Sequence, residues 1–116
     1  MKILLDTHVL LALIDPRISK LTTAIREMLT NDDSELFVSV ASLWEIAIKC
    51  RLGKLTLSPG LEMLPDLIRE MQIDILPINE QHVLTEVAPE PKTSDPFDRL
   101  LLSQCHVAGL RLAVVL

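Results

Sequence analysis

The chain has 116 residues, of which 49% are hydrophobic and 23% are charged. This length and composition suit one folded domain over residues 1–116 and exclude a disordered or collagen-like chain. The formal net charge is −5, and the aromatic residues are Phe37, Trp44 and Phe97. The sequence therefore lacks the general basicity of a protein that wraps duplex nucleic acid and the aromatic platform of a single-strand binder.

The N-terminal residues do not resemble a secretion signal, because the acid Asp6 interrupts the first apolar run. The longest apolar stretches, such as residues 9–14, fall far short of the ~18 residues that a membrane span needs. We therefore expect a cytoplasmic protein with no membrane contact. Cys50 and Cys105 lack the spacing of a disulfide scaffold or a zinc site and are interpreted as small core residues.

Four short apolar runs predict β-strands at residues 2–5, 35–38, 72–76 and 111–115. Their apolar residues follow one another instead of alternating with polar ones, which indicates a parallel sheet covered on both faces. Apolar residues at helical spacing lie between these runs. The predicted helices begin near Thr7, after a cap at Ser19, at Ser39 or Ser42, after residues 59–60, after residues 77–79 and at Pro96.

Gly53 and Gly109 are predicted to end two of these helices, the one that starts at Ser39 or Ser42 and the last one. The alternation of strands and helices predicts an α/β fold with a central parallel sheet. In such a sheet the ligand crevice lies beyond the carboxyl ends of the strands.

Three acids follow these elements at places that can face the crevice. Asp6 comes directly after the first strand, Glu45 lies in the helix after the second, and Asp98 lies at the start of the last helix. Other interpretations remain open for each. Asp6 and Asp98 also suit helix starts, and Glu45 can form an i,i+4 pair with Lys49. Asp95, just before a proline, is explained as a helix cap.

Carboxylates from three separate strand–helix units can converge on one crevice and bind Mg²⁺ or Mn²⁺, which prefer oxygen ligands and keep several waters. Such an ion polarises a phosphodiester and lowers the pKa of a bound water. An acidic pocket can thus act on an anionic polymer despite the negative net charge. A receiver-like signalling domain would need a second acid beside Asp6, and the chain has no nucleophile motif or glycine-rich phosphate loop.

Four segments resemble motifs of the PIN-domain family, and most closely those of its VapC-type toxins from bacterial toxin–antitoxin systems. The segments are LLDTHVL at residues 4–10, SVASLWEIAIK at 39–49, RLGKL at 51–55 and DPFDRLL at 95–101. The resemblance implies a three-layer α/β/α fold with a central parallel sheet. It also implies a metal-dependent endoribonuclease that uses Mg²⁺ or Mn²⁺, usually forms a homodimer and is neutralised by a cognate VapB-like antitoxin.

The resemblance also assigns roles to individual residues by motif position. The metal-binding and catalytic acids would be Asp6, Glu45 and Asp98. The supporting polar residues would be Thr7, Ser39 and, as a cap or a further support, Asp95. The candidate RNA contacts are Arg99 and the basic group Lys49, Arg51 and Lys54. This basic group equally suits helix-end charges that face water.

The end of the sequence departs from the family pattern, in which the last strand usually has the form Gly-Leu-x-Leu-Val-Thr-x-Asp. Here Val114 stands at the Thr position and Leu116 at the position of the fourth acid. We therefore expect a C-terminally truncated PIN-like domain with three metal-binding acids. The alternative is a catalytically impaired PIN-fold interaction module that binds an antitoxin or a partner subunit without cleaving RNA.

Overall fold

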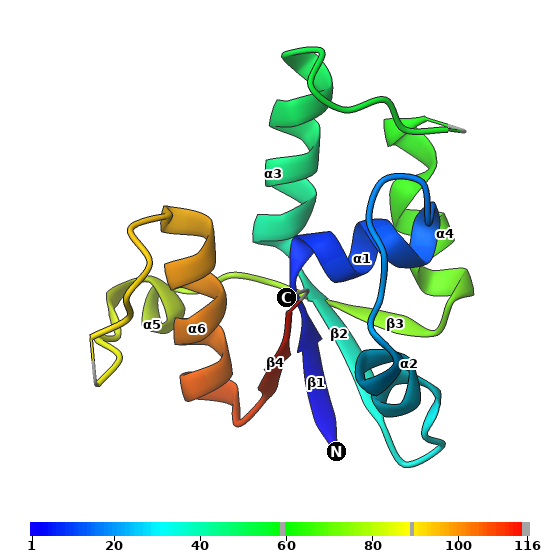
Figure 1. Cartoon of the computed structure of the whole chain (residues 1–116). Coiled ribbons are helices and arrows are strands. Elements are labelled where there is room, and N and C mark those ends of the chain that lie inside the picture. Colours follow the sequence, from blue (N-terminus) through cyan, green and yellow to red (C-terminus); the bar gives the residue numbers. More distant parts are fainter. Residues whose placement is uncertain (59, 89, 115–116) are drawn as a thin grey trace.

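The computed structural model describes residues 1–58, 60–88 and 90–114. Its centre is a four-stranded sheet in the order β3-β2-β1-β4, in which all neighbouring strands are parallel (Figure 1). The strands are β1 (Lys2–Leu5), β2 (Glu35–Ser39), β3 (Ile73–Leu76) and β4 (Arg111–Ala113). The parallel sheet predicted from the sequence is confirmed. Residue 115 of the predicted fourth strand and Leu116, the residue at the fourth acid position, lie outside the described residues.

Helices connect the strands at nearly the predicted places. They are α1 (Thr7–Ile14), α2 (Thr23–Thr30), α3 (Val40–Arg51), α4 (Leu64–Glu70), α5 (Glu80–Leu84) and α6 (Pro96–Ala108), with a short 3-10 helix, η1 (Leu61–Met63), before α4. The predicted cap at Ser19 is wrong. The hydroxyl of Thr22 caps α2 instead, because it directly precedes the first helical residue and accepts a hydrogen bond from the N–H of Ile25 at 3.2 Å.

The strands bury side chains on both faces of the sheet. Ile3 and Leu5 belong to a core cluster with residues of α1 and α4, whereas Leu4, between them, belongs to a cluster with residues of α6. Figure 1 shows the same division, with α1, α2 and α4 on one side of the sheet and α5 and α6 on the other. The three-layer α/β/α fold is confirmed. Cys50 and Cys105 are free thiols packed against these two clusters, and burial raises the pKa of Cys105 to about 11.

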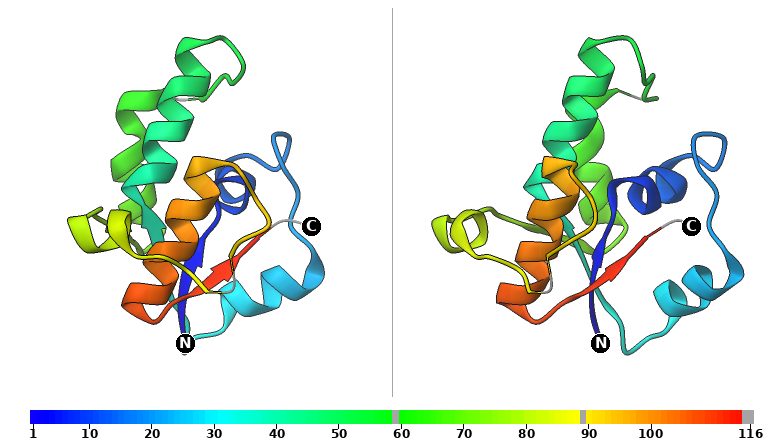
Figure 2. Two further views of the ribbon diagram at one scale, coloured as in Figure 1. Left: turned by 90° about the vertical axis from the view of Figure 1, so that its left-hand side faces the viewer. Right: turned by 60° about the vertical axis from the view of Figure 1, so that its left-hand side comes forward.

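The carboxyl edge of the sheet collects the starts of several helices. The two central strands, β1 and β2, lead directly into α1 and α3. The N–H of Asp6 donates to the carbonyl of Ala113 at 2.9 Å, which ties the end of β1 to β4. α3 projects from this edge and contacts both α1 and α6 (Figure 2). No helix in the described parts of the chain is long and apolar enough to cross a membrane.

Candidate active site

Asp6 lies at the carboxyl end of β1 and caps α1. Its Oδ1 accepts a hydrogen bond from the N–H of His8 at 2.7 Å, which is the usual N-cap interaction. The Nδ1 atom of His8 lies 3.4 Å from the same oxygen. Capping fixes this carboxylate at the edge of the sheet where the predicted crevice lies, so the cap and a role in a site are compatible.

Two hydroxyls, both almost fully buried, hold the carboxylate of Glu45. The Oγ1 atom of Thr7 lies 2.8 Å from Oε1 of Glu45 and 2.9 Å from Oγ of Ser42. Thr7 has a single hydroxyl proton, and an ionised carboxylate can only accept hydrogen bonds. Thr7 therefore donates to Glu45, and Ser42 donates its own proton to Thr7. This chain of hydrogen bonds fixes one oxygen of Glu45 from two helices, α1 and α3.

The second oxygen of Glu45 has a charged partner. Oε2 lies 2.9 Å from Nζ of Lys49, one turn further along α3. The i,i+4 pair considered from the sequence is therefore formed. The side chains are 12% exposed for Glu45 and 34% exposed for Lys49, so the cation lies nearer to solvent than the carboxylate.

Asp98 lies in the first turn of α6, and its pKa is raised. Partial burial is the largest cause, followed by the negative charge of Asp95, and the charges of Asp6 and Glu45 act in the same direction. A hydrogen bond from Oγ1 of Thr93 to Oδ2 of Asp98, at 3.3 Å, acts in the opposite direction. Charges on two other helices, at Asp6 and Glu45, therefore contribute to the electrostatic surroundings of Asp98.

The donor set of this site fits a hard divalent cation. Within the described ranges, no group of three or more Asp, Glu, His and Cys side chains is arranged to hold a metal ion. Mg²⁺, however, keeps several waters and takes only one or two carboxylates directly, so a preformed cage is not required. After burial, the negative charges of neighbouring acids raise the pKa of Asp98, and a bound cation would offset these charges.

The model of the PIN domain family matches residues 3–115. The chain belongs to the PIN domain family. A comparison with curated proteins finds none that matches. PIN domains are generally nucleases, so the resemblance seen in the sequence is confirmed at the level of the family and its nuclease fold.

Ser39 and Asp95, which were predicted to support the site of this PIN domain, are helix caps. Ser39 is fully buried, and its Oγ accepts a hydrogen bond from the N–H of Ala41 at 3.0 Å. Asp95 caps α6 by accepting from the N–H of Phe97 at 2.9 Å. Each cap fixes the start of a helix that carries one of the three acids.

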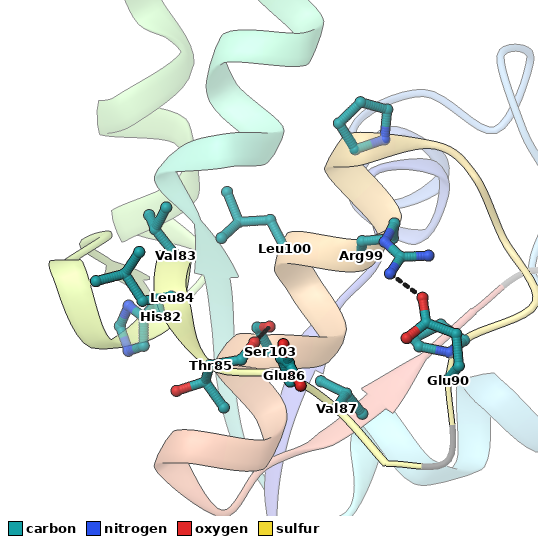
Figure 3. A pocket seen from close by; sticks show the side chains of 12 residues that line it. His82, Val83, Leu84, Thr85, Glu86, Val87, Glu90, Arg99, Leu100 and Ser103 are labelled. Atoms are coloured by element: carbon teal, nitrogen blue, oxygen red, sulfur yellow. Dashed lines mark hydrogen bonds and ion pairs between the residues drawn. The ribbon is translucent and has the colours of Figure 1, made fainter.

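Arg99 faces the loop before α6. Its guanidinium pairs with Glu90 and donates to the carbonyl of Thr93 at 3.1 Å. Figure 3 shows the ion pair beside a cavity of about 570 Å³ between α5 and α6. The three candidate acids do not line this cavity. Arg99 therefore holds the loop in this structure, and the larger cavity is separate from the candidate chemistry.

A smaller cavity, of about 370 Å³, lies beside one of the acids. It lies between α3 and the start of α6, and its lining includes Glu45, Lys49, Leu52, Lys54 and Phe97. Two of the three cations of the basic group that the sequence suggested for RNA contact therefore line this cavity. The third, Arg51, is exposed at the end of α3.

The sequence did not indicate that Ser42 and Thr93 contribute hydrogen bonds to the candidate site. Ser42 precedes Glu45 by three residues on one helix, and this i,i+3 spacing is a signal that could have placed its hydroxyl near the carboxylate. The contact of Thr93 with Asp98 depends on the path of the loop before α6. The sequence indicates only that this loop is proline-rich.

Proposed function

We propose that this PIN domain is a metal-dependent endoribonuclease of the VapC toxin type that hydrolyses RNA phosphodiester bonds. The observation that carries the proposal is the arrangement of the three acids: Asp6 caps α1, Thr7 of α1 donates to Glu45 of α3, and Asp98 lies in the first turn of α6, which contacts α3. Negative charges gathered in this way create a potential that attracts a divalent cation. Membership of a family of nucleases supports the class of reaction.

In this proposal Asp6, Glu45 and Asp98 hold Mg²⁺ or Mn²⁺ directly or through water. The bound ion supplies Lewis acidity toward the phosphodiester and lowers the pKa of the attacking water. Thr7 donates to one oxygen of Glu45 and orients the carboxylate, and a cation would compete with Lys49 for the second oxygen. Lys49, which pairs with that second oxygen, is placed to neutralise a substrate phosphate at the same point.

We also propose that the chain acts in the cytoplasm as a homodimer and that a cognate VapB-like antitoxin neutralises it. The support is the likeness of residues 4–10, 39–49 and 95–101 to VapC-type motifs. Sedimentation of the purified protein tests the dimer. Coexpression with a VapB-like antitoxin tests the proposed neutralisation, which should suppress RNA cleavage.

The experiment that tests the nuclease activity is cleavage of a structured RNA by purified protein with Mn²⁺ or with EDTA. Cleavage should require the cation and fall at least about 100-fold in Asp6→Asn and Asp98→Asn, the order of loss seen when one preorganised electrostatic group is removed. The matched control is Asp66→Asn, which neutralises a largely exposed acid on α4 that lies outside the site.

Cleavage that persists in EDTA, or that is equal in the Asp98 and Asp66 variants, would contradict the proposal. A folded protein that cleaves no RNA with saturating Mn²⁺ would also contradict it. That last result would favour the alternative of a PIN-fold interaction module.

A further inference from the structure

We propose that Trp44, together with the cavity lined by its neighbour Phe97, forms a base-stacking subsite for single-stranded RNA next to the candidate active site. The inference rests on the proposed ribonuclease function and names a surface that selects its substrate. The rings of Trp44 and Phe97 contact each other edge to face, with centroids 5.7 Å apart and planes at 74°. Two of the three aromatic side chains in the chain therefore meet at one place.

The ring of Trp44 is available to a ligand. Trp44 is 60% exposed, although tryptophan is highly buried on average in folded proteins. The edge-to-face contact with Phe97 holds the indole from one side. A ring that is already held loses little conformational entropy when a base stacks on it.

Each member of the aromatic pair is the sequence neighbour of a candidate acid. Trp44 precedes Glu45 in the chain, and Phe97 precedes Asp98. Because consecutive Cα atoms are about 3.8 Å apart, each ring starts one residue from a candidate acid. Phe97 and Glu45 also line the same cavity of about 370 Å³. A nucleotide whose phosphate lies at the acids therefore has an aromatic surface within reach of its base.

Cations border the same cavity. Lys49 and Lys54 line it. Two hydrogen bonds at the end of α3 fix the backbone of Lys54. The N–H of Lys54 donates to the carbonyl of Lys49 at 2.9 Å, and the N–H of Gly53 donates to the carbonyl of Cys50 at 3.1 Å. This is a Schellman motif. None of the ion pairs found among the described residues includes Lys54 or Arg51. An aromatic ring bordered by cations is the pattern that binds single strands.

A second copy of the chain is the competing occupant, because Val40, Trp44 and Leu52 form an exposed apolar row along α3. Charge favours RNA. The row begins beside the acids that the reaction needs and ends at Arg51 and Lys54, whose positive charges attract phosphates. The chain as a whole carries a net charge of −5, so this cluster of cations is a local feature.

The test uses the fluorescence of Trp44, which is the only tryptophan in a chain without tyrosine. Short single-stranded RNA is titrated into the whole protein in EDTA, so that binding is measured without cleavage. We expect saturable quenching by RNA and little quenching by an abasic oligonucleotide of the same length and charge. Equal quenching by both oligonucleotides, or no quenching by RNA, would overturn the proposal.

Variants separate stacking from fold and charge. By anisotropy of a labelled RNA, Trp44→Ala should bind about 5- to 150-fold more weakly, the fold-change that corresponds to one stacked base, and Trp44→Phe should recover part of the loss. Val40→Ala, which shortens another exposed apolar residue of the row but does not line the cavity, is the matched control and should bind RNA like the wild type. Equal affinity of the Trp44→Ala variant and the wild type would overturn the subsite.

Salt dependence tests the cations. Lys54→Gln should reduce the slope of log K against log salt by about 0.7, the value for one single-strand phosphate contact. Arg51→Gln, at the same helix end but outside the cavity lining, should change it less. Equal reductions of the slope in both variants would contradict the role of Lys54 in the cavity.

Two further results keep the subsite and the nuclease proposal distinguishable. Quenching without any metal-dependent cleavage would leave the subsite standing and overturn the nuclease proposal. Self-association that is lost equally in Trp44→Ala and Val40→Ala, with unchanged RNA affinity, would assign the row to a second copy and overturn the subsite.

Discussion

At the scale of single residues, one hydroxyl proton decides how the candidate site is held. Thr7 lies between Ser42 and Glu45 and can donate to only one of them. The sequence suggested Thr7 as a polar neighbour of the metal. The structure gives it a specific task, because its hydroxyl orients the carboxylate of Glu45, whose second oxygen pairs with Lys49.

We predict that Thr7→Val lowers Mn²⁺ affinity and cleavage rate by about 10- to 100-fold, the usual effect of removing a hydrogen-bond partner of a metal ligand. Thr7→Ser retains the hydroxyl and should stay near the wild type. The measurement is a Mn²⁺ titration of cleavage for both variants, with thermal unfolding as a control for the fold. Equal losses in the two variants would contradict the account, because the hydroxyl that Thr7→Ser retains would then not be sufficient for the role of Thr7.

The raised pKa of Asp98 predicts a cost to stability in the absence of metal. The folded protein binds the Asp98 proton more tightly than the unfolded chain does, so stability is lost as pH rises from the unfolded pKa, 3.8, through the raised folded pKa. In EDTA at pH 7, Asp98→Asn should therefore have a higher free energy of unfolding than the wild type. The difference should shrink below pH 3.8. Urea unfolding at both pH values measures it, and a variant that is less stable at pH 7 would contradict the electrostatic account.

At the scale of elements, helix ends follow local chemistry that the sequence displays. Gly53, just beyond α3, has φ +73°, and Gly109, the C-cap of α6, has φ +69°, the left-handed region that glycine adopts without strain. An added Cβ at either position meets no atom within 4 Å. The cost of a substitution is therefore confined to the backbone.

Gly53→Ala and Gly109→Ala should each lower the free energy of unfolding by about 1–2 kcal/mol. Urea denaturation with unchanged m-values measures the effect. Ser58→Ala, in an exposed stretch outside the helices, should change it little. A loss well above this range in either glycine variant would point to packing effects that the structure does not show.

The strands and most helix starts could be predicted because each depends on a few adjacent residues. Ser39, Asn79 and Asp95 act as caps next to the helices that they begin. The error at Ser19 arose because two hydroxyl residues, Ser19 and Thr22, precede α2, and only the position of the first helical residue identifies Thr22 as the cap. Spacing alone does not show which of them the backbone reaches.

At the scale of the whole molecule, strand order decides which side chains meet. β1 and β2 are the two central strands, so Asp6, at the end of β1, and α3, which follows β2 and carries Glu45, start from neighbouring points of the sheet. This convergence of acids was expected from the sequence. The contact of Trp44 with Phe97 could not be predicted from the sequence, because it depends on how α3 packs against α6. The pair of Arg99 with Glu90 likewise depends on a loop path.

The central claim is that three acids form one cation site. Its most direct test is calorimetric titration of Mn²⁺ into the wild type and the site variants Asp6→Asn, Glu45→Gln and Asp98→Asn. The control variant is Asp66→Asn. The account predicts saturable binding by the wild type and the control, and at least about 10-fold weaker binding by each site variant. Unchanged affinity in all three site variants, or no saturable binding by the folded wild type, would contradict it.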